Sequence, residues 1–133
     1  MEDAAPERAR AAARMQRGQD AEKRAVALLA SAGLRLITRN YRCRTGELDV
    51  VASDGRLLVV AEVRMRSSEQ FGGAAASITW RKQRRIVRAT RHLLAAQPAL
   101  AALPVRFDVV IAGSAEGPLQ WIRAAFDCTD QRL

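Results

Sequence analysis

Two short apolar runs near the middle of the chain set the pattern from which the fold can be predicted. Residues 46–53 and 57–64 are rich in valine and leucine and flank an Asp-Gly pair, a strong signal for a β-hairpin. Side chains alternate between the two faces of a strand, so Glu62 interrupts the face that carries Leu58 and Val60. Because burying an acid costs free energy unless it has a partner, Glu62 is a candidate functional residue.

The turn decides which residues of this hairpin face each other. A two-residue Asp-Gly turn predicts that Glu47 faces Glu62 and that Asp49 lies diagonal to Glu62. Diagonal neighbours are roughly 7–8 Å apart at the backbone, so two carboxylates so placed can reach toward one divalent ion. A register shifted by one residue would send one carboxylate to the other face, so this inference depends on the turn.

Two stretches with helical periodicity frame the strands. An amphipathic helix is predicted over residues 18–33, with Glu22 at the edge of its apolar stripe, where an acid also complements the helix dipole. Residues 1–17 lack such a stripe and are expected to form a flexible or partly helical arm. A second helix is predicted over residues 80–96, with Lys82 at the start of its inward face.

The remaining apolar segments predict further strands. Residues 34–41 and 105–112 have strand patterns, and residues 119–124 predict a short edge strand, whereas residues 67–77 read as a loop. Because a helix separates the third and fourth strands, those two strands can run parallel. The expected order is helix, three strands, helix, strand, in a mixed α/β sheet flanked by helices.

Composition limits the class of protein. At 133 residues, with 49% hydrophobic and 27% charged, the chain is predicted to form one globular domain over residues 18–133. It shows no signal-peptide pattern and no apolar run long enough to span a bilayer, and Cys43 and Cys128 form no C-x-x-C pair. We therefore expect a cytoplasmic protein with reduced thiols and no membrane partner.

The net charge of +8 is concentrated in two segments. Residues 1–46 and 67–92 each sum to +5, while residues 47–66 and 93–133 each sum to −1. Basic segments thus flank the acidic hairpin, which favours nucleic acid as a partner over an anionic membrane surface, an acidic protein or a merely solubilising surface. The candidate phosphate contacts are Arg39, Arg42, Arg44, Arg66, Arg81, Arg84, Arg85 and Arg88.

Six short motifs in order carry a family resemblance. They are Gly18-x-x-Ala-Glu22, Arg39-Asn40-Tyr41-Arg42, Gly46-Glu47-Leu48-Asp49, Glu62-Val63-Arg64-x-Arg66, Arg81-Lys82-Gln83 and Arg106-Phe107-Asp108-Val109-Val110. The chain resembles the YraN-like family of small bacterial predicted endonucleases, which are distantly similar to archaeal Holliday-junction resolvases. The resemblance covers about residues 18–113 and implies the restriction-endonuclease-like fold, with the PD-(D/E)xK active site on the second and third strands.

The resemblance also implies roles for single residues. Asp49 and Glu62 would be metal carboxylates, Glu22 an accessory acid from the first helix, and Arg64 the occupant of the lysine position. Carboxylates bind Mg²⁺ or Mn²⁺, hard ions that favour oxygen ligands. Such a metal lowers the pKa of a water nucleophile and stabilises charge on the phosphate. The expected activity is hydrolysis of phosphodiester bonds, with DNA as the expected substrate.

Arg64 departs from the motif. Arginine stays protonated and cannot act as a general base, although it can neutralise phosphate charge. Two interpretations stay open: Lys82, one of two lysines in the chain, supplies the missing amine, or catalysis is weak or lost and the chain is a nucleic-acid-binding module. On the first interpretation Asp49, Glu62, Arg64 and Lys82 are the catalytic residues; whether the chain forms a homodimer also stays open.

Overall fold

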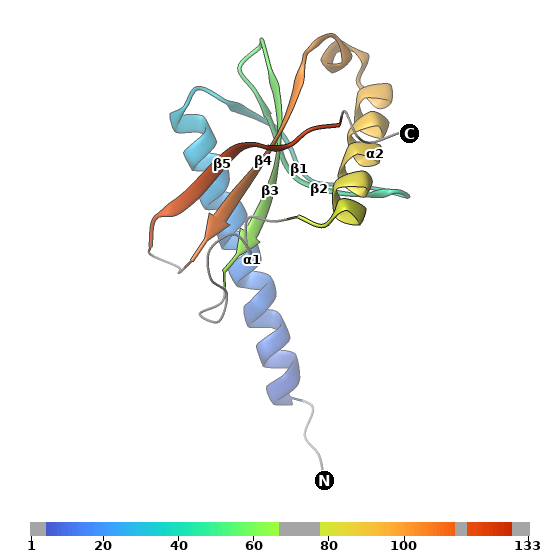
Figure 1. Ribbon diagram of the computed structural model, residues 1–133. Helices are drawn as coiled ribbons and strands as arrows, with labels where there is room; N and C mark the ends of the chain where they lie inside the picture. Colours follow the sequence, from blue (N-terminus) through green and yellow to red (C-terminus); the bar gives the residue numbers. More distant parts are fainter. Residues whose placement is uncertain (1–4, 67–77, 114–116, 129–133) are drawn as a thin grey trace.

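The computed structural model describes residues 5–66, 78–113 and 117–128. Within these residues the predicted mixed α/β fold is confirmed, including the edge strand at its end, and the order is that of a restriction-endonuclease-like core (Figure 1). The elements are α1 (Ala5–Ser31), β1 (Arg35–Cys43), β2 (Gly46–Ser53), β3 (Leu58–Met65), α2 (Trp80–Ala96), the 3-10 helix η2 (Pro98–Ala102), β4 (Val105–Ala112) and β5 (Leu119–Phe126).

The five strands lie in the sheet in the order in which they occur in the chain. β1, β2 and β3 are antiparallel neighbours, β3 and β4 are parallel, and β5 returns antiparallel to β4. The parallel pair was expected from the helix that separates its strands, because a crossover connection brings the chain back to the starting end of the sheet.

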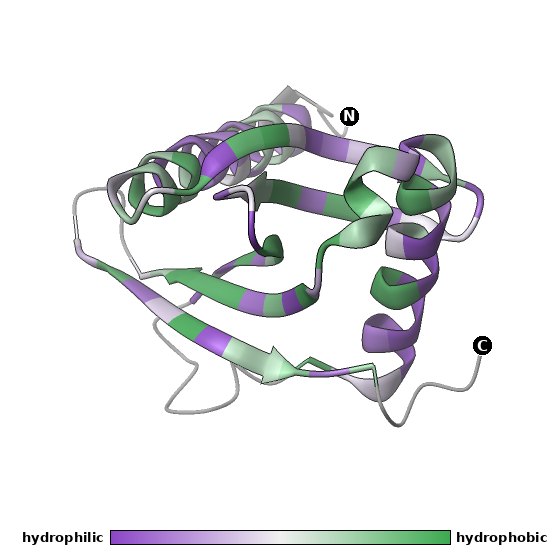
Figure 2. Ribbon diagram, turned by 90° about the horizontal axis from the view of Figure 1, so that it is seen from above, coloured by the Kyte–Doolittle hydropathy of each residue, from purple (hydrophilic) through white to green (hydrophobic). Residues whose placement is uncertain are grey.

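The two helices cover opposite faces of this sheet. Ala25 and Leu29 of α1 pack with Val59 on one face, while Leu93 of α2 packs with Phe107 on the other. Figure 2 shows apolar stretches of the central strands between the helices, and alternating apolar and polar bands along α2. The protein therefore has three layers, with the strands buried between two amphipathic helices.

The turn between β2 and β3 is longer than predicted. Ser53 pairs with Leu58, so four residues form the turn instead of two. Asp54 Oδ1 accepts hydrogen bonds from the backbone N–H groups of Arg56 and Leu57, at 2.8 and 2.9 Å, and these bonds stabilise the longer turn.

This turn changes the register by two residues, so the prediction that Glu47 faces Glu62 is wrong. Glu47 instead lies opposite Arg42 of β1. Continuing the observed register one residue beyond the Val50–Ala61 pair places Asp49 directly opposite Glu62. Because a shift of two residues keeps every side chain on its face, the two carboxylates still share a face of the sheet.

β2 and β3 separate just where these carboxylates lie. Their ladder ends at the Val50–Ala61 pair. Before Val50, β2 is paired only with β1. After Ala61, β3 is paired only with β4. Asp49 and Glu62 are therefore the first residues on either side of an opening between two central strands.

α1 begins at Ala5 rather than near Gly18. Every residue from 6 to 17 is exposed, and this part of the helix projects past the end of the sheet (Figure 1). Its alanines and arginines have high helix propensity, which extends the helix although no apolar stripe packs this part against the sheet. No helix in the described part of the chain has the length and apolarity to cross a bilayer.

Candidate active site

Asp49 lies at the point where β2 leaves β3. Its Oδ2 accepts a hydrogen bond of 2.9 Å from the backbone N–H of Val63. A side-chain carboxylate thus binds a β3 amide beyond the last pair of the β2–β3 ladder. This bond fixes the direction of the Asp49 carboxylate toward β3 and the opening.

Glu62 projects from β3 on the α2 side of the sheet and is only 8% exposed. The Nζ of Lys82 lies 3.1 Å from Glu62 Oε1. Lys82 belongs to the first turn of α2, where Thr79 caps the helix by accepting a hydrogen bond from the Lys82 backbone N–H at 3.1 Å. The cap therefore fixes the start of the helix that brings the ammonium group to the carboxylate.

The two carboxylates strongly influence each other. Burial, followed by the negative charge of Glu62, raises the pKa of Asp49 from 3.8 to about 8, even though the Val63 N–H acts in the opposite direction. A side-chain hydrogen bond with Glu62 and the charge of Glu22 raise this pKa further. At neutral pH Asp49 therefore keeps its proton, while the neighbouring Glu62 has the Lys82 ammonium beside it.

Glu22 reaches the same region from α1 but is engaged elsewhere. Its side chain is 15% exposed, and Oε1 lies 3.2 Å from a guanidinium nitrogen of Arg39. The Arg39 guanidinium also donates to the Gln19 carbonyl at 3.4 Å. Among the described residues no group of three or more His, Cys, Asp and Glu side chains is placed to hold a metal ion. The structure thus assembles the Asp49–Glu62 pair but not the three-acid set.

This pair suits a hard divalent cation. Both side chains offer oxygen ligands, and burial followed by the charge of Glu62 raises the pKa of Asp49, so a bound cation would favour its ionised form. Mg²⁺ is commonly bound through one or two protein carboxylates, with water and phosphate oxygens completing its coordination. Two carboxylates are therefore a sufficient protein contribution to such a site.

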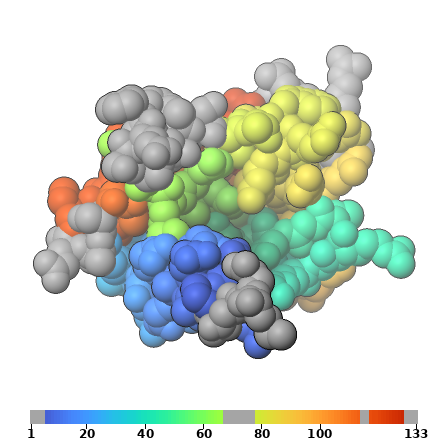
Figure 3. Space-filling model, turned by 90° about the horizontal axis from the view of Figure 1, so that it is seen from below, coloured from blue at the N-terminus to red at the C-terminus, as the bar shows by residue number. Residues whose placement is uncertain are grey.

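A pocket of about 400 Å³ lies beside the pair, between the β1–β2 hairpin and the start of α2. Figure 3 shows the end of the molecule where α1, the β1–β2 hairpin and α2 surround β3. The pocket joins Asp49 to three cationic groups, so it can accept a phosphate next to the carboxylates. Residues lining it include Arg42, Gly46, Glu47, Asp49, Lys82 and Arg85.

Gly46 permits the close approach that forms this pocket. A Cβ atom at Gly46 would lie 3.0 Å from the backbone oxygen of Arg85, which is tighter than ordinary packing. In the sequence, Gly46 stood out only as part of the motif Gly46-Glu47-Leu48-Asp49. Its position at the start of a strand was the available signal, because a glycine there often marks a close backbone approach.

Arg64 lies two residues after Glu62 and so on the same face of β3, where it is half-buried. No hydrogen bond or ion pair joins its guanidinium to another described residue. The ammonium group that contacts Glu62 is that of Lys82, which comes from a different element. The structure therefore places Lys82, rather than Arg64, next to the carboxylate pair.

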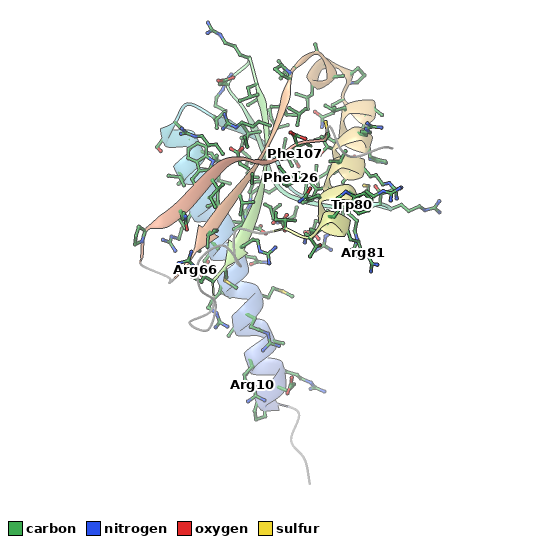
Figure 4. All side chains as sticks on the ribbon, viewed as in Figure 1. Arg10, Arg66, Trp80, Arg81, Phe107 and Phe126 are labelled. Carbon is green, nitrogen blue, oxygen red and sulfur yellow. The ribbon has the colours of Figure 1, made fainter. Side chains whose placement is uncertain are left out.

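The arginines predicted to contact phosphate divide into two groups. In the first, Arg39 binds Glu22, Arg66 donates to Gln120 Oε1 at 3.1 Å, and Arg84 lies 5.1 Å from the centre of the Trp80 ring. The pairing of Arg39 was missed, because it depends on how α1 packs on the sheet. The second group is exposed around the pocket and along α2 (Figure 4 shows Arg81) and consists of Arg42, Arg44, Arg81, Arg85 and Arg88.

Comparison with known proteins places the chain in a family. Residues 21–112 match the family described as uncharacterised protein family UPF0102. The chain belongs to this family. It is 55% identical over 119 residues to a UPF0102 protein of Xanthomonas oryzae pv. oryzae strain PXO99A, covering 90% of this chain and 98% of that relative. A UPF0102 protein of Nitrosomonas europaea is 50% identical over 112 residues, covering 84% of this chain and 93% of that relative.

The UPF0102 assignment confirms the resemblance to the YraN-like proteins. The matched segment contains all four residues of the candidate site region, whereas the projecting half of α1 and the whole of β5 lie outside it. The family description names no activity. These four residues are Glu22, Asp49, Glu62 and Lys82.

Proposed function

We propose that this UPF0102 protein is a divalent-metal-dependent endonuclease that hydrolyses phosphodiester bonds in DNA. The observation that carries the proposal is the pair of adjacent carboxylates, Asp49 and Glu62, with the Lys82 ammonium 3.1 Å from one of them. Buried acids of like charge destabilise a fold unless a proton or a cation neutralises them. The two carboxylates lie at an opening of the sheet, beside a pocket with cationic walls. A metal ion at the carboxylates and a phosphate in the pocket would therefore lie next to each other.

In this proposal Asp49 and Glu62 hold Mg²⁺ or Mn²⁺. When bound, such an ion would lower the pKa of a water molecule and stabilise negative charge on the phosphate. Lys82 has two tasks: its ammonium holds Glu62 in place, and it adds positive charge where the transition state accumulates negative charge. Arg85, on the same pocket wall, binds a phosphate oxygen.

Lys82 can also replace the lysine of the PD-(D/E)xK motif, whose position is occupied by Arg64. Arg64 cannot accept a proton but can neutralise phosphate charge from the face of β3 that carries Glu62. An amine at Glu62 is nevertheless present, because α2 supplies it. This geometry favours an active enzyme over a nucleic-acid-binding module that has lost its catalytic group.

The exposed arginines around the pocket supply the remaining contacts to the substrate. They bind the sugar-phosphate backbone without reading its sequence, so affinity should fall steeply as salt is added. Cations at the pocket and along one face of α2 would guide the backbone across the carboxylate pair. These residues are Arg42, Arg44, Arg81, Arg85 and Arg88.

The test is a cleavage assay with purified protein and end-labelled duplex, single-stranded and four-way DNA, in Mg²⁺, Mn²⁺ or chelator. We expect metal-dependent products that disappear with Glu62→Gln. A matched control is Glu47→Gln, which removes a charge from the exposed wall of the same pocket and should retain activity.

Each other outcome has a definite meaning. Products that survive Glu62→Gln would assign the cleavage to a different site or to a contaminant. Salt-sensitive DNA binding with no product in either metal would establish the binding module instead. If the protein neither binds nor cleaves any of the three DNA forms, the proposal is wrong.

A further inference from the structure

The projecting half of α1, residues 6–17, is an exposed basic helix that we call the basic arm. It carries four arginines against one glutamate. Figure 4 shows Arg10 on this part of α1, beyond the end of the sheet. The only ion pair within the arm, between Arg10 and Glu7 at 3.2 Å, is exposed and contributes little to stability.

The basic arm starts beside the candidate active site. Arg17, its last residue, lies two residues before Gln19, whose carbonyl oxygen accepts a hydrogen bond from Arg39. One turn further along α1, Glu22 is close enough to raise the pKa of Asp49. The arm therefore leads away from the carboxylate pair at the end of the molecule where the pocket lies (Figure 3).

The face of the arm that continues the buried stripe of α1 is polar. In the packed half of the helix this stripe consists of Leu29, Ala25 and Ala21. Continued backward in helical steps, it passes Gly18 and reaches Arg14, and then Ala11 and Glu7, with Arg10 at its edge. The side of the helix that would pack against a sheet, a membrane or an apolar partner thus presents small and charged side chains instead of an apolar stripe.

These features favour a polyanion as the occupant. A helical segment of this length is marginal in water by itself, and the positive charges along it repel one another. Phosphates spaced along a nucleic acid would relieve that repulsion and hold the segment helical. A second copy of the chain would do the opposite, because it would bring two basic arms together.

The geometry points to the basic arm as a second nucleic-acid contact that lies along the phosphate backbone of the duplex flanking the active site. This inference rests on the proposed function for the identity of the substrate. At about 1.5 Å per residue the arm is roughly 18 Å long, which equals about five base pairs of duplex. It would extend the binding footprint by that length on one side of the cleavage point.

The experiment compares two double variants that lose the same charge. Arg10→Gln/Arg14→Gln alters the arm, and Arg35→Gln/Arg56→Gln alters exposed arginines of β1 and the β2–β3 turn, away from the arm (Figure 1). Glutamine keeps the helix propensity, which circular dichroism would check. Fluorescence anisotropy in chelator would measure binding to duplexes of about 10 and about 20 base pairs at several salt concentrations.

We expect the wild-type protein to bind the longer duplex more tightly than the shorter one. The arm variant should lose about tenfold in affinity for the longer duplex and lower the salt slope by about 2, because two phosphate contacts are removed. It should bind the shorter duplex nearly as well as the wild type. The control variant should show neither a selective loss on the longer duplex nor a lower slope.

The alternatives give different results. Equal losses in both variants would show that only net charge matters, and a dimer that dissociates in the arm variant would show that the arm binds a second copy; either result overturns the inference. An arm variant that binds the longer duplex like the wild type, while wild-type cleavage persists, overturns the inference and leaves the proposed function standing. Wild-type protein that binds neither duplex and cleaves nothing overturns both.

Discussion

Two aspartates of the same sheet, one completely buried and one half-buried, show how differently a carboxylate can be used. Asp108 on β4 is completely buried, and its two oxygens accept four hydrogen bonds. Arg106 donates two of them at 2.9 Å each, the Trp121 indole donates a third at 2.9 Å, and the backbone N–H of Ala124 donates the fourth at 3.0 Å. The last two bonds join the side chain of Asp108 to β5.

Asp49 has a very different set of neighbours. It accepts a bond from one backbone N–H, and the other group next to it is a second acid, Glu62, which helps raise its pKa to about 8. Burial by itself therefore does not identify a functional acid. An acid whose bonds are completed by the fold is structural. Asp49 instead faces another acid beside an open pocket, and the Lys82 ammonium contacts Glu62 rather than Asp49.

The largest expected effect is the loss of cleavage when Asp49, which lies next to a second acid, is replaced by the neutral asparagine. Asp49→Asn should lower the cleavage rate by roughly 10³-fold or more, because it removes a proposed metal ligand, while the protein stays folded. Single-turnover cleavage of labelled DNA, with circular dichroism as the check on folding, measures this. Cleavage within tenfold of the wild type would break the contrast between the two aspartates.

Asp108, whose oxygens are hydrogen-bonded by the fold, should instead affect the stability of the protein. Asp108→Ala is expected to lower the free energy of unfolding by about 3–5 kcal/mol, because it leaves the Arg106 guanidinium and other donors without their acceptor. Urea unfolding followed by circular dichroism measures the change. If this variant is unfolded without urea, Asp108→Asn, which keeps one oxygen, allows the measurement. A loss under about 1 kcal/mol for either variant would contradict the structural assignment.

A smaller effect is expected for the cation beside Glu62. Lys82→Met should reduce the cleavage rate by about 10–100-fold, since the metal ligands remain but a positive charge near the phosphate is lost. Lys82→Arg should recover part of the rate. Arg91→Gln, which removes an exposed charge further along α2, is the control and should change the rate by less than about threefold. Equal rates for wild type and Lys82→Met would remove Lys82 from the site.

The smallest effect is on stability as pH changes. Folded Asp49 keeps its proton up to about pH 8, whereas the unfolded carboxyl releases it near 3.8. Between these values the folded state binds more protons, so this group lowers the free energy of unfolding as pH rises. The melting temperature of Asp49→Asn relative to wild type should therefore increase by several degrees from pH 4 to pH 8. Parallel pH profiles would contradict the raised pKa.

Much of the fold follows from local patterns that the sequence makes visible. The apolar alternation predicts the strands, the helix between β3 and β4 predicts their parallel pairing, and both predictions are confirmed. The length of the turn after Ser53 was not predictable in the same way. It depends on the side chain of Asp54, which binds two backbone N–H groups and stabilises four turn residues where the Asp-Gly pair suggested two.

The candidate site was less accessible to such reasoning. The face of β3 and the inward stripe of α2 were enough to suggest that Glu62 and Lys82 lie near each other, and their charged groups are 3.1 Å apart. The ion pair between Glu22 and Arg39 depends on the angle at which α1 packs on the sheet. The hydrophobic periodicity of the sequence does not determine this packing angle. The same holds for the opening between β2 and β3, since it arises where the β2–β3 ladder ends while each strand stays paired with its other neighbour.

Titration of the protein with Mn²⁺ tests the central claim most directly, because it measures binding at the carboxylate pair without any substrate. Calorimetry at neutral pH, in two buffers of different ionisation enthalpy, would report both the affinity and the release of a proton. We predict saturable binding that releases a proton in the wild type and is lost in both Asp49→Asn and Glu62→Gln. No saturable binding in the wild type, or binding that both variants retain, would contradict the account.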